Sequence, residues 1–227
     1  MAQFHFVEDY ERLIKSLLAV HPVETAMELA VGGKYELLGE IERDILVHAG
    51  LRNGMTVVDL GCGSGRLAHA LGKVMKIDYW GIDIVEELLR YARTKAPNNY
   101  EFVLNRKLTL PIGDAAADMV CAFSVFTHLL HTETYLYLQD FRRVLKPGGR
   151  AIFSFFEFTE PNHWPVFDGT VATQRNSSTP HLNMFIERNA IELWSNKLGF
   201  EVERFIDSQA APWGGDALGQ TIAILVK

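Results

Sequence analysis

Cysteine is scarce in this sequence: only Cys62 and Cys121 occur among its 227 residues. Two cysteines in a chain of this length do not form the disulfide framework of a secreted scaffold, so both are expected to be packed thiols. Long apolar runs are missing too, and residues 1–9 lack the basic stretch followed by an apolar stretch that marks a secretory signal. We therefore expect a cytoplasmic protein with no membrane partner.

Basic residues are outnumbered by acidic ones. Lys and Arg together number 22 against 28 Asp and Glu, the net charge is −6, and the basic residues do not cluster. Nucleic-acid binding depends on clustered basic side chains, so no nucleic-acid partner is expected and a small-molecule substrate is favoured. The sequence indicates no metal site. Its length suits one α/β domain with additions.

The most informative stretch runs from Thr56 to Leu67. A β-branched apolar run ends at three glycines on alternate positions, Gly61, Gly63 and Gly65, and helix-compatible residues follow at once. This order predicts a strand, a tight turn and a helix. Alternating glycines permit left-handed backbone and close approach of a ligand, while the N–H groups of the new helix point toward it. We expect a ligand-binding turn here.

Two side chains indicate which ligand the turn binds. The dinucleotide fingerprint has glycine at its first, third and sixth positions, and counting from Gly61 the sixth position is Arg66. Asp59 would repel a pyrophosphate but suits a positively charged ligand. Residues 57–65 resemble the glycine-rich motif of class I S-adenosylmethionine (SAM)-dependent methyltransferases, whose cofactor carries an ammonium and a sulfonium. The resemblance implies SAM as cofactor, bound by Asp59, Gly61, Cys62, Gly63 and Gly65.

A second signal follows in the next predicted strand, residues 79–83. Asp83 closes that strand, where an acid is placed to accept hydrogen bonds from both ribose hydroxyls. Asp83 with Glu86 three residues later also fits a helix N-cap with a capping box. Both roles can hold, because a cap uses one carboxylate oxygen and leaves acceptor capacity on the other. The resemblance also places Ile84 at the cofactor.

The resemblance implies further contacts after the third and fourth predicted strands. Asn105 stands where family members often carry an acid for the adenine amino group, and its side-chain oxygen can accept the same hydrogen bond. Ser124 is expected at the carboxyl edge of the sheet, where open α/β sheets bind ligands. His128 follows closely and is the candidate catalytic or substrate-contacting residue. The alternative for His128 is a structural histidine bonded to a nearby carbonyl.

The expected fold is α/β. Apolar spacing predicts amphipathic helices in the first 50 residues. The resemblance implies a seven-stranded, mostly parallel, doubly wound sheet with an antiparallel last strand and a helical N-terminal cap. We expect one methyltransferase domain over residues 1–227, with the cap at 1–50 and the cofactor-binding core at 51–156. Residues 157–183 have little periodicity and are expected to form a loop-like insert or lid, before a closing helix and strand pair at 184–227.

The resemblance implies transfer of a methyl group from SAM to an oxygen, nitrogen or carbon atom of a small acceptor. An acceptor that starts protonated also needs a base, for which His128, His163 and Glu157 are candidates. Two alternatives stay open. One is a non-catalytic regulatory protein that binds SAM or S-adenosylhomocysteine, because no substrate motif is recognisable. The other is a nicotinamide-dependent oxidoreductase, which Arg66 and Asp59 disfavour. The sequence leaves the acceptor and the oligomeric state open.

Overall fold

The computed structural model describes residues 7–176 and 183–227. Its centre is a seven-stranded sheet with the strand order β3-β2-β1-β4-β5-β7-β6. Strands β1 to β5 pair in parallel, whereas β7 lies between β5 and β6 and pairs antiparallel with both. The predicted sheet with an antiparallel last strand is confirmed. The strands are β1 Thr56–Leu60, β2 Asp78–Asp83, β3 Glu101–Leu104, β4 Ala117–Ala122, β5 Leu145–Phe155, β6 Glu201–Ile206 and β7 Thr221–Val226.

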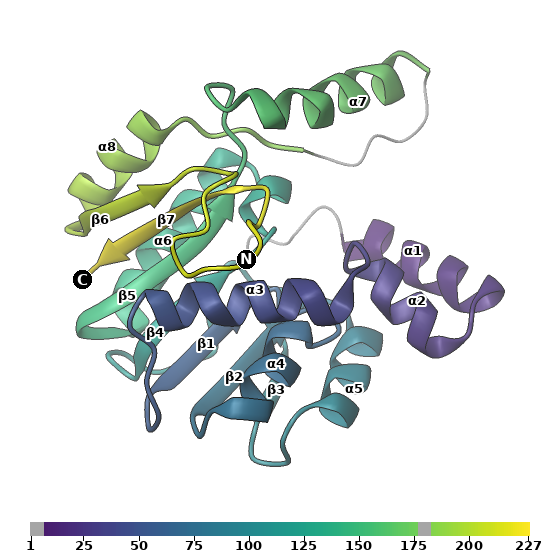
Figure 1. Ribbon diagram of the computed structural model, residues 1–227, viewed down its shortest axis with the longest axis horizontal. Coiled ribbons are helices and arrows are strands. Elements are labelled where there is room, and N and C mark those ends of the chain that lie inside the picture. The colour runs from purple at the N-terminus through teal and green to yellow at the C-terminus, as the bar shows by residue number, and fades with distance from the viewer. Residues whose placement is uncertain (1–6, 177–182) are drawn as a thin grey trace.

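Helices cover both faces of the sheet because side chains along each buried strand alternate between the faces. In β1, Val57 packs with α3, α4 and α5 on one face, whereas Val58 packs with α6 and α8 on the other. Figure 1 shows α3 lying along the first of these faces. The helices are α1 Val7–Val20, α2 Val23–Ala30, α3 Tyr35–His48, α4 Arg66–Val74, α5 Glu86–Lys95, α6 His131–Val144, α7 Trp164–Arg175 and α8 Arg188–Leu198.

The first two helices form the predicted N-terminal cap together with α3. Helices α1 and α2 lie side by side at one end of the molecule, next to α5 (Figure 1). Ile14 of α1 and Met27 of α2 pack against Val85 and Leu88 at the start of α5. This apolar contact sets the cap beside the carboxyl end of β2, the edge of the sheet where ligands bind in open α/β folds.

Residues 157–176 are more regular than the sequence predicts. The loop-like insert contains a short 3₁₀ turn at Pro161–His163 and then the three-turn helix α7. Every side chain of α7 is at least partly exposed, so no buried stripe imposes the helical period by which an amphipathic helix is recognised. The prediction of an irregular insert is therefore wrong over α7, and its part at residues 177–182 lies outside the described residues.

Within the described ranges, no helix combines the length and apolar character needed to cross a membrane.

Candidate cofactor site

A cavity of about 520 Å³ opens at the carboxyl edge of the parallel strands. It lies beside β1, whose neighbours β2 and β4 extend the sheet in opposite directions. Ligands bind at such switch points because the connections on either side diverge and leave a crevice. All residues that the sequence assigns to cofactor binding line this cavity except Gly65, and His128 lines it as well; the set is Asp59, Gly61, Cys62, Gly63, Asp83, Ile84, Asn105, Ser124 and His128.

The three glycines of the turn all have left-handed backbone, with φ of 72° at Gly61, 55° at Gly63 and 86° at Gly65. The predicted strand, turn and helix are confirmed. A Cβ at Gly63 would lie 2.7 Å from Val31 of the cap, and one at Gly65 would lie 2.7 Å from Ala92 of α5. Gly65 therefore lies outside the cavity because it packs α4 against α5, and Gly63 brings the turn into contact with the cap.

The N–H groups of the turn are largely used within the protein. Gly61 and Cys62 donate to the carbonyl of Ile82 at 2.7 and 3.2 Å, and Gly63 donates to Oδ2 of Asp83 at 2.9 Å. These bonds fasten the end of β1 to the end of β2. Anion binding by these three amides, as in a phosphate-binding loop, is thereby weakened, which fits a ligand without a pyrophosphate.

Asp83 is 8% exposed, and each of its carboxylate oxygens accepts one backbone N–H bond. Oδ2 accepts from Gly63 and Oδ1 accepts from Val85 at 3.0 Å. Burial raises the pKa of Asp83, and the backbone N–H groups oppose that shift. Each oxygen retains a second lone pair, so the carboxylate keeps the capacity to accept hydroxyl donors from a ligand in the cavity.

The alternative role of Asp83 as a helix cap is wrong. Helix α5 begins at Glu86, and Val85 occupies its N-cap position in extended conformation. Asp83 stands two residues before that position, and its carboxylate turns toward the N–H groups of Val85 and Gly63. The residue thus braces the glycine turn, a long-range contact that spacing along the chain does not reveal.

Asp59 is 3% exposed, and both of its oxygens have donors inside the protein. Tyr79 donates its hydroxyl to Oδ2 at 2.5 Å, and Cys121 lies across the β1–β4 pairing with its thiol 3.6 Å from Oδ1. Burial raises the pKa of Asp59 from 3.8 to about 7, against the hydrogen bonds that favour the charged form. Asp59, which the sequence assigns to a positively charged ligand, is therefore hydrogen-bonded within the protein and carries only partial charge at neutral pH.

Glu42 and Arg66 line the same cavity and were not assigned to it from the sequence. Arg66, the first residue of α4, donates to Oε1 of Glu42 from α3 through Nε at 2.8 Å and approaches it through a terminal nitrogen at 2.5 Å. A third bond, of 2.7 Å, joins Arg66 to the carbonyl of Val31. A Cβ at Gly39 would lie 2.5 Å from the Arg66 carbonyl oxygen, so this glycine lets α3 approach α4 closely.

A signal for Glu42 exists in the sequence. Glu42 continues the buried stripe of α3, which also contains Gly39, Ile41, Ile45 and Leu46. A carboxylate in a buried stripe requires a partner, and Arg66 at the start of the next helix supplies it.

The side chain of Asn105 is half-buried and is used within its own loop. Nδ2 donates to the carbonyls of Lys107 and Thr109 at 3.2 and 2.6 Å, and Oδ1 accepts from the N–H of Lys107 at 3.2 Å. Its oxygen has one remaining lone pair for a ligand. Adenine recognition by Asn105 stays a prediction.

Ser124 has a left-handed backbone, with φ of 57°, which is uncommon for a residue other than glycine. Its N–H donates to Oγ of Ser154 at 2.7 Å, and its own Oγ accepts from Nε2 of Gln220 at 3.0 Å. Gln220 directly precedes β7 and also lines the cavity, a contribution that the sequence did not indicate. Strained backbone held by surrounding hydrogen bonds often marks a ligand site.

His128 lines the cavity from the 3₁₀ turn after β4, opposite the cap. The ring of Tyr10 from α1 meets it edge to face, with ring centroids 6.2 Å apart. Burial raises the pKa of Tyr10, and the negative charge of Asp83 raises it further. The cap therefore contributes directly to the part of the cavity that contains His128.

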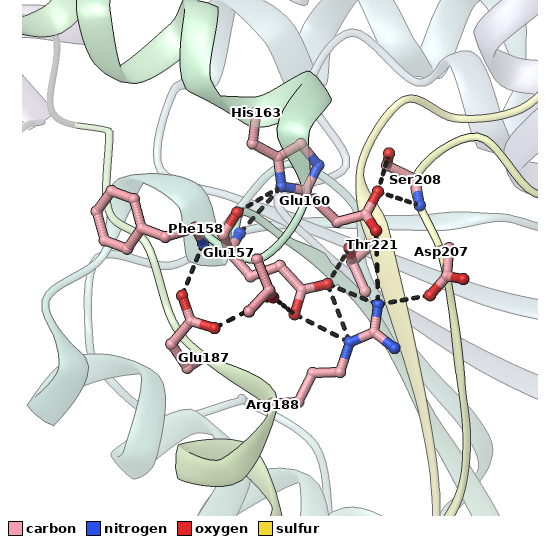
Figure 2. Close-up of polar contacts among 10 residues, drawn as sticks. Glu157, Phe158, Glu160, His163, Glu187, Arg188, Asp207, Ser208 and Thr221 are labelled. Atoms are coloured by element: carbon pink, nitrogen blue, oxygen red, sulfur yellow. Dashed lines mark hydrogen bonds and ion pairs between the residues drawn. The ribbon is translucent and has the colours of Figure 1, made fainter.

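His163 and Glu157, the other two candidate bases, are not among the residues that line the cavity. Figure 2 shows them in a polar cluster with Arg188 and Thr221. Glu157 is fully buried and accepts hydrogen bonds from Arg188 on both oxygens, at 2.8–3.0 Å, and from the hydroxyl of Thr221 at 2.5 Å. Nδ1 of His163 lies 3.0 Å from the backbone nitrogen of Glu157. These contacts join the chain just after β5 to α8 and β7.

The comparisons with known proteins agree with this geometry. A family model described as a methyltransferase domain matches residues 58–153, from β1 to β5. Residues 58–153 are thus a methyltransferase domain. The predicted family and fold are thereby confirmed, and SAM is the cofactor of this class. A demethylmenaquinone methyltransferase of Lactococcus lactis is 33% identical over 108 residues, which cover 44% of this chain and 41% of the relative.

Solved structures extend the match over nearly the whole methyltransferase fold. Magnesium protoporphyrin IX methyltransferase from Synechocystis PCC 6803, with bound S-adenosylhomocysteine, is 20% identical at a TM-score of 0.67, covering 98% of this chain and 96% of that one. The cyclase SpnF is 18% identical at a TM-score of 0.61, covering 82% and 80%. The chain spans about half the length of the curated relatives it matches. These structural matches establish the fold, and the reaction is argued from the site.

Proposed function

We propose that the protein transfers a methyl group from SAM to a small-molecule acceptor. The observation that carries this proposal is the acidic cavity at the switch point of the sheet, with Asp83, Asp59 and Glu42 in its wall. Three carboxyl groups and one guanidinium disfavour a pyrophosphate and favour a ligand that has hydroxyl donors and positive charge. The cavity volume is within the range of small-molecule sites.

The residues present fit an adenosyl ligand with a cationic tail. Asp83 retains acceptor capacity for the two ribose hydroxyls, and the glycine turn supplies the backbone beside them. Asn105 and Ser124 are the proposed contacts at the edges of the site, with Cys62 and Ile84 between them. SAM supplies an electrophilic methyl group on its sulfonium, so the protein's own part is to align the two reactants and exclude water.

The acceptor is proposed to bind between the cap and the loop after β4. Tyr10 and Leu13 of α1 and Leu129 beside His128 give this side of the cavity an apolar and aromatic wall. Such a wall favours a small acceptor with an apolar or aromatic body. One relative is named as a methyltransferase of demethylmenaquinone, a quinone and therefore a compound of this kind. His128 is proposed to hold or receive the proton of an acceptor that starts protonated.

The second candidate function is binding without methyl transfer. The fold is compatible with it, because a structure named as a cyclase shares the fold and the fold therefore does not determine the reaction. A nicotinamide-dependent oxidoreductase is the weaker alternative, because the sixth position of the turn is Arg66 and the wall is acidic.

Two measurements test the proposal. Calorimetric titration with SAM, S-adenosylhomocysteine, NAD and NADP is expected to give tighter binding of both adenosyl ligands than of either dinucleotide; the reverse order contradicts the methyltransferase assignment. Incubation with SAM labelled on its methyl group and a panel of quinols, phenols and amines is expected to label one acceptor class. Binding of SAM without label transfer to any acceptor class favours the non-catalytic alternative.

A further inference from the structure

The cap helix α3 gives the cavity an acidic group that remains available to a ligand. The side chain of Glu42 is 3% exposed, and Glu42 lines the cavity with Asp59 and Arg66. Both contacts from Arg66 go to the same oxygen, Oε1. The other oxygen, Oε2, has no partner among the residues that the structure describes. Oε2 is not among the fully buried side-chain atoms that lack a partner, so it is open to the cavity and can accept a hydrogen bond from a donor there.

Asp59 is less suited to that donor, although it precedes the glycine turn. Both of its oxygens already accept hydrogen bonds, from Tyr79 and Cys121. Its pKa of about 7, raised by burial, leaves it only partly charged at neutral pH. At Glu42 burial also raises the pKa, but the contact with Arg66 opposes that shift. Of the two carboxyl groups, Glu42 therefore has the free acceptor.

The two residues face the same region of the cavity. The negative charge of Glu42 raises the pKa of Asp59, and the positive charge of Arg66 lowers the pKa of both carboxyl groups. Such effects require the three side chains to be close together. Asp83, the proposed ribose contact, lies at the end of the neighbouring strand β2. An adenosyl ligand with its ribose at Asp83 thus has an acidic region beside β1 for a cationic substituent.

We propose that Glu42, rather than Asp59, receives the α-ammonium group of the methionine tail of SAM through Oε2. This inference rests on the proposed function and names the group that recognises one part of the cofactor. Because Glu42 belongs to α3, the cap takes part in cofactor binding as well as in enclosing the acceptor. A charge-assisted hydrogen bond in a buried site corresponds to about a 10- to 100-fold gain in affinity.

The test is a calorimetric cycle with two proteins and two ligands. The ligands are S-adenosylhomocysteine and its analogue with hydrogen in place of the α-amino group, and the variant is Glu42→Gln, which keeps the side-chain length and a carbonyl oxygen for Arg66. Wild-type protein should bind the analogue about 10- to 100-fold more weakly than S-adenosylhomocysteine. In Glu42→Gln the two ligands should bind with similar affinity. Glu40→Gln, an exposed change on the same helix, is the matched control and should behave as wild type.

Each outcome decides the inference. Equal binding of the two ligands by wild-type protein overturns it without any variant, so a folding defect in Glu42→Gln cannot obscure the result. An undiminished preference for the amino group in Glu42→Gln also overturns it, while SAM binding by wild type leaves the proposed function intact. If wild-type protein binds neither SAM nor S-adenosylhomocysteine, the proposed function fails, and the inference fails with it.

Discussion

Replacement of Asp83 by asparagine separates its two roles, the brace of the glycine turn and the proposed ribose contact. The carboxylate accepts from Gly63 at 2.9 Å and from Val85 at 3.0 Å. Asparagine has one acceptor oxygen, so one of these N–H groups loses its partner. The loss of one hydrogen bond to a buried charged group lowers the free energy of unfolding by roughly 1.5–3 kcal/mol. Ligand-free Asp83→Asn should therefore unfold at a lower temperature than wild type.

The ribose contact predicts a further loss that the brace does not. Losing one charge-assisted bond from a ribose hydroxyl costs roughly 1.5–3 kcal/mol of binding free energy, or about 10- to 100-fold in affinity. The same factor should apply to S-adenosylhomocysteine and to 5′-methylthioadenosine, because both carry the ribose and only the former carries the amino-acid tail. Asp78→Asn, an exposed change at the start of the same strand, is the control.

The assays are thermal unfolding without ligand and calorimetric titration of the folded protein. A lowered unfolding midpoint together with weaker binding of both ligands supports both roles. A lowered midpoint with dissociation constants within about twofold of wild type would refute the ribose contact, because a purely structural residue changes the folded fraction and not the affinity of folded molecules.

Three other predictions follow from the site. Gly63→Val should abolish SAM binding while circular dichroism shows a retained fold, because φ of 55° and the contact with Val31 exclude a branched side chain; wild-type affinity would refute this. The raised pKa of Asp59, about 7, means that the native state keeps a proton that the unfolded state releases. Stability should fall as pH rises from about 4 to 7, by up to about 1.4 kcal/mol per pH unit, and Asp59→Asn should flatten that slope in denaturant titrations. His128→Asn should leave SAM affinity within about twofold but lower methyl transfer by about 100-fold in the labelling assay, and an unchanged rate would exclude a base at His128.

The strands and helices with one buried face were predictable because burial imposes a period on the sequence. The run at β1, the turn of Gly61 to Gly65 and the following helix α4 all appear where the pattern predicts them. Helix α7 was missed because all of its side chains are at least partly exposed, so packing imposes no period on it. The capping box at Asp83 was a false local signal, since the carboxylate turns toward a distant turn.

Within the candidate site, local motifs located residues but not their bonds. Spacing from the glycine turn brought Asp59 and Asp83 to the cavity, yet the donors that occupy Asp59 come from β2 and β4. Gln220 reaches Ser124 from 96 positions away along the chain, a contact with no local signal. Such pairs depend on strand order and register, which a single sequence does not state.

The sequence by itself determined the family, the glycine turn and the strand ends that carry Asp59 and Asp83, because these depend on backbone conformation over a few consecutive residues. Only the tertiary structure decided which carboxylate oxygens are free. Glu42 becomes part of the site because α3 packs on α4 through Gly39 and because Arg66 donates a hydrogen bond to Oε1 of Glu42. The charge of a buried group and its unused hydrogen-bonding capacity depend on its neighbours in space. Those neighbours come together only when the sheet and its helices have packed.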